Sequence, residues 1–99
     1  MKTKITSPAC ADKLKVLSDP TRLGVLETLM SGPKNVGELM DELDVEQSLL
    51  SHHLAILRDA GLVESSRVGK SMIYQVQESV SDSTADKAIN LGCCKISFD

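Results

Sequence analysis

The chain has 99 residues and a formal net charge of −3, and aromatic residues make up only 2% of it. The length fits one domain covering residues 1–99, and the scarcity of aromatic side chains excludes base stacking on single-stranded nucleic acid as a main mode of binding. Because apolar stretches fall far short of the roughly 20 residues of a membrane span and the N-terminus lacks a secretory signal, we expect a cytoplasmic protein without membrane contact. A chain this small buries a limited core, which favours a dimer.

The first two thirds of the chain predict four helices. Ser7 is a candidate N-cap for the first, in "SPACADKLKVLS", and Asp19 is one for the second, in "DPTRLGVLETLM", each with proline next. Asn35 and Glu38 have the spacing of a capping box that opens a short third helix. The fourth, "QSLLSHHLAILRDAG", ends at Gly61, a typical residue just beyond a helix.

The pattern changes after residue 61. The apolar period falls from about 3.6 to 2, and "LVESSRV" and "SMIYQVQ" flank "GK" as in an antiparallel hairpin. We expect a last helix over residues 83–91, stopped by Gly92, and no element in the tail "CCKISFD". The predicted fold is mostly α with a β-hairpin: a winged helix-turn-helix of about five helices and a two-stranded wing.

This order of elements points to DNA reading, because the second helix of such a motif fits the major groove. Leu50, Leu54 and Leu57 define the inward face of the fourth helix. The outward polar residues, which suit contacts with bases or phosphates, are Gln47, Ser48, Ser51 and His52, and the hairpin tip adds Arg67 and Lys70. His53, beside the apolar stripe, is interpreted as a packed, hydrogen-bonded histidine.

The acidic balance argues against a general nucleic-acid binder. However, residues 36–44 hold four acidic side chains and no basic one, whereas residues 45–76 hold three of each sign. The acidic side chains are therefore concentrated mainly outside the face that is proposed to contact DNA. We expect binding that weakens steeply with salt.

These residues resemble the ArsR/SmtB family of bacterial metal-responsive repressors. The resemblance covers "LSDPTRLGVLETL" and "VGELMDELDVEQSLLSHHLAILRDAGLVESSRVGKSMIYQV". It implies a homodimer joined through its first and last helices, which binds an imperfect palindrome of double-stranded operator DNA and releases it when an inducer binds elsewhere. It also implies that the reading residues are the four named on the fourth helix.

Two inducer sites known in this family are missing here. One is a Cys-x-Cys in a segment of the type "ELCVCDL", but the matching "ELMDEL" holds no cysteine. The other uses Asp and His on the last helix, where this chain has Asp82 and Asp86 but no histidine.

The thiols remain as candidate ligands. Cys10 lies in the predicted first helix, and the adjacent Cys93 and Cys94 follow the predicted last one. The tail "GCCKISF" resembles that of some arsenic-responsive members. Trivalent arsenic or antimony takes three thiolates in a pyramid, and soft ligands select soft ions. We therefore expect an As(III) or Sb(III) inducer, no permanent cofactor, and a sensor and dimer region in residues 1–18 and 82–99.

Alternatives stay open at this point. The same thiols suit cadmium or another soft metal, or a redox or sulfide signal through a disulfide or polysulfide link from Cys10 to Cys93 or Cys94. A thiol enzyme with a histidine base would need cysteine and histidine in one site, and no enzyme is predicted. A helix-turn-helix used only for protein contacts would show no salt-dependent promoter binding.

Overall fold

The computed structural model describes residues 8–81 and 88–98. Ser7, Asp82, Asp86 and the first part of the helix expected over residues 83–91 lie outside these residues. The elements, in chain order, are α1 (Pro8–Val16), α2 (Pro20–Leu29), β1 (Lys34–Asn35), α3 (Val36–Leu43), α4 (Gln47–Asp59), β2 (Val63–Val68), β3 (Ser71–Val76), a 3₁₀ turn (Glu78–Val80), β4 (Ala88–Asn90) and β5 (Lys95–Ser97).

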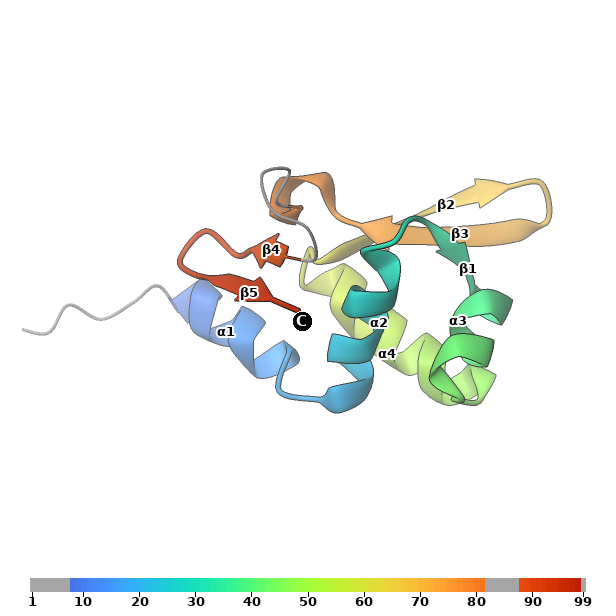
Figure 1. Ribbon diagram of the computed structural model, residues 1–99, viewed down its shortest axis with the longest axis horizontal. Coiled ribbons are helices and arrows are strands. Elements are labelled where there is room, and N and C mark those ends of the chain that lie inside the picture. Colours follow the sequence, from blue (N-terminus) through green and yellow to red (C-terminus); the bar gives the residue numbers. More distant parts are fainter. Residues whose placement is uncertain (1–7, 82–87, 99) are drawn as a thin grey trace, which may run out of the picture.

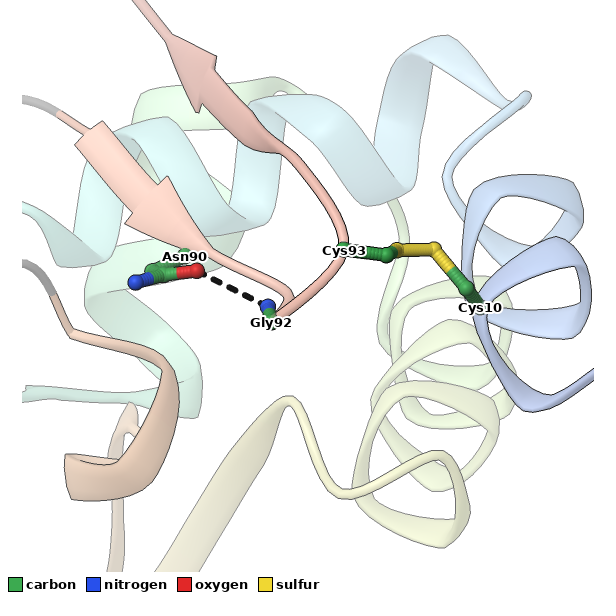
Figure 2. Close-up of a disulfide and its surroundings, with 4 residues drawn as sticks. All are labelled: Cys10, Asn90, Gly92 and Cys93. Atoms are coloured by element: carbon green, nitrogen blue, oxygen red, sulfur yellow. Dashed lines mark hydrogen bonds between the residues drawn. A yellow bond between two sulfur atoms is a disulfide. The ribbon is translucent and has the colours of Figure 1, made fainter. Parts of the chain in front are cut away.

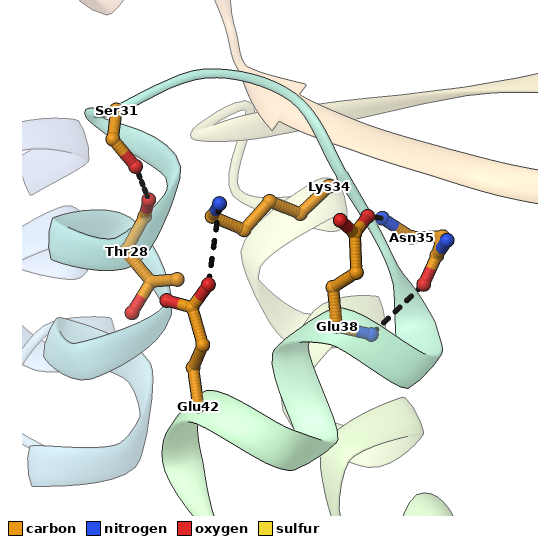
Figure 3. A network of polar contacts seen from close by, with 6 residues as sticks. All are labelled: Thr28, Ser31, Lys34, Asn35, Glu38 and Glu42. Carbon is orange, nitrogen blue, oxygen red and sulfur yellow. Dashed lines mark hydrogen bonds and ion pairs between the residues drawn. The ribbon is translucent and has the colours of Figure 1, made fainter.

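The helix boundaries follow local chemistry. An Asp19 carboxylate oxygen accepts hydrogen bonds from the backbone N–H groups of Thr21, at 2.8 Å, and Arg22, at 3.1 Å. Asn35 and Glu38 form the reciprocal capping box that opens α3, at 2.8 and 2.9 Å, as Figure 3 shows. Backbone groups at a helix start have no partner within the helix, so these caps fix where α2 and α3 begin. The predicted N-caps of both helices are confirmed.

Two further features set the α2–α3 connection and the end of α4. The ammonium of Lys34 lies 3.2 Å from a carboxylate oxygen of Glu42, which ties β1 to the last turn of α3 (Figure 3). Gly61 has a φ of +75°, a backbone conformation that glycine adopts without steric cost. The predicted end of the fourth helix is therefore confirmed.

A three-stranded antiparallel sheet in the order β1-β3-β2 contains the predicted hairpin. Val63 pairs with Val76 at its base, and Val68 pairs with Ser71 at its tip. Strand β1 was not predicted. Its two residues, Lys34 and Asn35, pair with β3 rather than with a neighbour in sequence.

The core lies between α2, α3, α4 and the base of β2. Its fully buried leucines are Leu26, Leu39, Leu50, Leu54, Leu57 and Leu62. Helices α2 and α3 approach closely at Gly24, where an added Cβ would lie 3.1 Å from a methyl carbon of Leu43. A packed core of this kind holds α4 rigidly, with one face inward and the other toward solvent.

The C-terminal segment corrects the prediction of a helix over residues 83–91. Its described part, residues 88–90, is strand β4, which pairs antiparallel with β5, and β5 lies in the tail that was expected to form no element. Ala88, Ile89 and Leu91 are buried. A short apolar run of this kind fits a strand or a helix equally well, and Gly92, interpreted as a helix stop, is instead in the hairpin turn.

Figure 1 shows how the ends of the molecule differ. The β4–β5 hairpin lies beside α1 at one end of the long axis, and the tip of the β2–β3 hairpin projects at the opposite end. None of the helices among the described residues has the length and apolar character of a membrane span. The four helices and the projecting hairpin form a winged helix-turn-helix, and the predicted fold class is confirmed.

Candidate DNA interface and thiol site

Helix α4 presents the polar face that the sequence predicts. Leu50, Leu54 and Leu57 are buried against the core. On the opposite face Gln47, Ser48, Ser51 and His52 are all exposed. Leu49, exposed to 45%, lies beside them and offers an apolar contact surface of the kind that suits a thymine methyl.

The start of α4 carries an internal contact. The Ser48 hydroxyl donates to a carboxylate oxygen of Glu46 at 2.9 Å, and Glu46 makes no side-chain cap to the helix. A helix N-terminus favours anions because its N–H groups point outward. The Glu46 carboxylate supplies one such anion next to the proposed reading residues.

The wing places two cations at its tip. Arg67 lies near the end of β2, and Lys70 lies in the turn itself, next to Gly69 with its φ of +63°; both cations are exposed. Val68 at the same tip is 62% exposed. A hairpin tip that carries two exposed cations is suited to phosphate contacts that position a protein on DNA.

The acidic residues of α3 are partly engaged in the fold itself. Glu38 belongs to the capping box, and Glu42 pairs with Lys34. Asp41 and Asp44 are exposed, and Asp44 ends the helix in the left-handed conformation. The four acidic side chains of residues 36–44 thus lie on α3 or at its end, whereas the candidate DNA residues lie on α4 and the wing.

The three cysteines come together at the other end of the molecule. Cys10, on α1, is 6% exposed, whereas Cys93 is exposed and Cys94 half-buried in the β4–β5 turn. Their Sγ atoms all lie within 4.8 Å of one another. In this arrangement Cys10 comes from α1, and Cys93 and Cys94 come from the β4–β5 turn.

A single disulfide joins Cys10 to Cys93, with their Cα atoms 6.3 Å apart (Figure 2). Cys94 remains a free thiol. This is one of the two pairings considered from the sequence for a redox signal. The site therefore offers three thiols when it is reduced and one when it is oxidised.

The β4–β5 turn is built to hold its cysteines in place. Gly92 has a φ of +92°, and its N–H donates to the Asn90 side-chain oxygen at 2.8 Å, as Figure 2 shows. The Leu91 N–H donates to the Cys94 carbonyl at 2.9 Å, which closes the turn. Because these bonds fix the backbone on both sides, Cys93 and Cys94 are held facing α1.

His53 behaves as the sequence indicates, as a packed and hydrogen-bonded residue. It is 7% exposed, and its Nδ1 accepts a hydrogen bond from Nε of Arg22 at 3.1 Å. The cluster of thiols contains no histidine. The structure thus gives no support to a cysteine–histidine catalytic pair among the described residues.

The sequence did not assign a role to Arg22, although it stands in the conspicuous "DPTR" motif. Its partners are the Val16 carbonyl and His53, the latter 31 positions away. No local pattern reports a contact at that separation. The local signal for it is limited to an arginine in the first turn of α2, three residues after the cap residue Asp19.

Comparison with known proteins places the chain among regulators. The sequence pattern described as "Bacterial regulatory protein, arsR family" matches residues 19–65. The chain is 38% identical over 79 residues to the HTH-type transcriptional regulator NmtR of Mycobacterium tuberculosis, covering 80% of this chain and 66% of that one. It therefore spans slightly less than two thirds of NmtR. It is 34% identical over 85 residues to the biofilm growth-associated repressor of Xylella fastidiosa, covering 86% and 75%.

Solved structures agree with this placement. Reduced HlyU from Vibrio cholerae superposes with a TM-score of 0.68 at 34% identity, over 72% of this chain and 75% of that one. The homodimeric winged helix-turn-helix DNA-binding domain of Mb0332 from Mycobacterium bovis, described as a possible ArsR-family regulator, gives a TM-score of 0.67 at 28% identity, over 70% and 64%.

Proposed function

The chain belongs to the ArsR family of bacterial regulatory proteins, and from this premise we propose that it is a repressor controlled by its three thiols. It is a transcriptional regulator with a DNA-binding fold and not an enzyme. In the proposal it binds operator DNA in the cytoplasm and releases it when Cys10, Cys93 and Cys94 bind trivalent arsenic or antimony.

The DNA side of the proposal rests on α4 and the wing. The exposed face of α4 enters the major groove with Gln47, Ser48, Ser51 and His52, and Arg67 and Lys70 hold phosphates. The homodimeric neighbour supports a dimer. In the proposal, the two α4 helices of this dimer read an imperfect palindrome with half-sites one helical turn apart. Residues 1–18 and 82–99 would form its interface, and parts of both segments lie outside the described residues.

The observation that carries the inducer proposal is the mutual approach of the three Sγ atoms to within 4.8 Å in one chain. A soft ion that takes three thiolates needs three sulfurs on one side of it, and this cluster supplies them. The sulfurs come from α1 and from the β4–β5 turn, two segments separated by most of the chain. Ligand binding would thus link two segments that are far apart in the sequence.

A second candidate function rests on the Cys10–Cys93 disulfide. Disulfides in cytoplasmic proteins of mesophiles are usually transient and redox-sensing. With hydrogen peroxide as oxidant, the two thiols lose two electrons and two protons to form the S–S bond, and peroxide becomes two water molecules. One neighbouring structure is described as reduced HlyU from Vibrio cholerae, which is in keeping with this candidate.

The test measures binding of a DNA fragment from upstream of the protein's own gene. Fully reduced protein, without oxygen, is titrated with arsenite, antimonite, cadmium and zinc, and separate samples receive only hydrogen peroxide. Release by arsenite or antimonite under reducing conditions supports the metalloid proposal. Release by cadmium alone identifies a different soft metal, and release by peroxide alone supports the redox candidate.

One variant separates the two functions. Cys94→Ser removes the third thiolate but leaves the Cys10–Cys93 pair. Release by arsenite is expected to disappear in this variant, whereas release by peroxide is retained. A Cys94→Ser protein that still responds fully to arsenite would rule out the three-thiolate site. Cys10→Ser, which removes a partner in both chemistries, is the matched control and is expected to abolish both responses.

A further inference from the structure

Arg22 connects the thiol helix to the reading helix. It lies in the first turn of α2, and its Nη1 donates to the Val16 carbonyl, the last residue of α1, at 2.8 Å. Its Nε donates to Nδ1 of His53, in the middle of α4, at 3.1 Å. The guanidinium of a residue on α2 therefore contacts two other elements of the fold, α1 and α4.

The guanidinium is suited to this position. Arginine presents donors in a rigid planar fork, so two acceptors in different directions are satisfied at once, which the point charge of lysine does not reproduce. The Val16 carbonyl lies at the C-terminal end of a helix, where carbonyls lack helical partners and a cation is favoured. The Arg22 backbone is fixed as well, because its N–H donates to Asp19.

The acceptor on α4 is buried among the residues that position the reading face. His53 is packed beside Leu50, Leu54 and Leu57 on the inward side of α4. Because its Nδ1 accepts a hydrogen bond, the proton of the neutral ring is on Nε2. The next residue back is His52, whose exposed ring lies 5.5 Å from that of His53, centroid to centroid, with the planes 61° apart. The contact therefore ends directly behind the proposed DNA face.

The thiol site lies at the other end of α1. Cys10 is near the start of this nine-residue helix and Val16 is its last residue. The helix is thus held at its first turn by the Cys10–Cys93 link and at its end by Arg22. A helix rises about 1.5 Å per residue and moves as a rod, so a shift imposed at Cys10 is transmitted to the Val16 carbonyl.

We propose that Arg22 is a positioning residue that couples the state of the thiols to the orientation of α4, through its paired hydrogen bonds to Val16 and His53. The inference rests on the proposed function, since it concerns how the thiol signal reaches the DNA face. Hydrogen-bond networks and rigid helices that join two sites are physical carriers of such coupling. The coupling is measured as the ratio of operator affinities of the reduced protein without and with arsenite.

The experiment compares that ratio in four variants. Arg22→Lys keeps the charge but loses the fork, and His53→Leu removes the acceptor, so both are expected to reduce the ratio from the roughly 5- to 150-fold typical of allosteric regulators to within about twofold. His53→Asn keeps a side-chain acceptor close to the place of Nδ1 and is expected to retain most of the ratio. Arg58→Lys, an equivalent change at an exposed site on α4, is the matched control and leaves it unchanged.

The operator affinity of the reduced variants is expected to stay within a few fold of the wild type. A purely structural role would lower affinity with and without arsenite alike and leave the ratio intact, which would overturn the inference. If the wild type itself does not respond to arsenite, the proposed function fails and this inference fails with it. If the wild type responds to arsenite, and the Arg22→Lys and His53→Leu variants show the same ratio of operator affinities as the wild type, only the coupling role is overturned.

A spectroscopic measurement without DNA gives an independent answer. The chain has only two histidines, so a His52→Gln variant assigns the imidazole ¹⁵N resonances. Addition of arsenite to the reduced wild-type protein is expected to shift the Nδ1 resonance of His53, because the Arg22 bond to it changes. In Arg22→Lys this shift disappears. A His53 resonance that arsenite leaves unmoved in the wild type would overturn the coupling.

Discussion

The wing cations allow the DNA proposal to be tested by salt dependence. Arg67 and Lys70 are exposed at the hairpin tip, at the opposite end of the molecule from the thiols (Figure 1). Replacing both with glutamine removes two positive charges from each protomer and leaves the packed base of the hairpin untouched. Since the two side chains are proposed to hold phosphates, the change should act on the electrostatic part of binding alone.

The size of the effect follows from counterion release. Each phosphate contact contributes about 0.9 to the slope of log affinity against log salt concentration, so two contacts contribute about 1.8 per protomer and about 3.6 per dimer. Between about 50 and 200 mM salt, the wild-type dimer should therefore lose roughly 150-fold more affinity than the variant does. The two proteins should approach equal affinity at high salt.

Fluorescence anisotropy with a labelled operator duplex, repeated across this salt range, measures both slopes. Lys13→Gln with Lys15→Gln, on α1, removes the same charge far from the wing and is the matched control. A slope that is unchanged when Arg67 and Lys70 are replaced, or that changes equally in the control, would refute the assignment. Non-operator DNA of the same length should show the same change in slope, because phosphate contacts carry no sequence information.

Three further predictions concern single residues. The hydrogen bond from the Arg22 backbone N–H lowers the pKa of Asp19 in the folded protein. The Asp19 carboxylate therefore stabilises the fold at pH values above its ordinary pKa of 3.8, and this contribution is lost as the pH falls through the lowered pKa. The melting temperature of the wild type should exceed that of Asp19→Asn above this range and equal it below, and a difference that persists at the lowest pH would contradict the prediction. Glu46→Gln, which removes an anion from the start of α4, should strengthen operator binding by about two- to tenfold at low salt and less at high salt, and unchanged or weaker affinity would contradict this. Gly92→Ala, at a φ of +92°, should cost about 1–3 kcal/mol in unfolding free energy and weaken arsenite binding in calorimetry, whereas Gly32→Ala, at a φ of +135° far from the thiols, should lower stability without that weakening.

The features that can be predicted from the sequence are those whose determining residues lie within a few positions of the feature itself. The cap of α2 needs only Asp19 and the next three residues, and the capping box needs only Asn35 and Glu38. The inward face of α4 follows from the spacing of its leucines, because a helix repeats every 3.6 residues. Each of these signals is complete within one or two helical turns.

The features that could not be predicted depend on contacts between distant segments. Strand β1 exists because Lys34 and Asn35 meet β3 almost 40 residues later. Residues 88–90 form a strand because β5 pairs with them, although the local pattern fits a helix as well. The Arg22–His53 bond joins positions 31 apart, and the disulfide joins positions 83 apart. Local periodicity contains no information about such partners.

In the proposed function, the three sulfurs make a metalloid and an oxidant competing signals rather than additive ones. The Cys10–Cys93 disulfide consumes two of the three thiols that a pyramidal arsenic or antimony site requires, and Cys94 alone is too few. Conversely, an ion bound to all three thiolates shields them from oxidation. Both chemistries tie α1 to the same β4–β5 turn, so both act on the same end of the molecule and reach α4 from the same side. A repressor with this arrangement would release its operator when either chemistry occupies the thiols, through the same change in the position of α1.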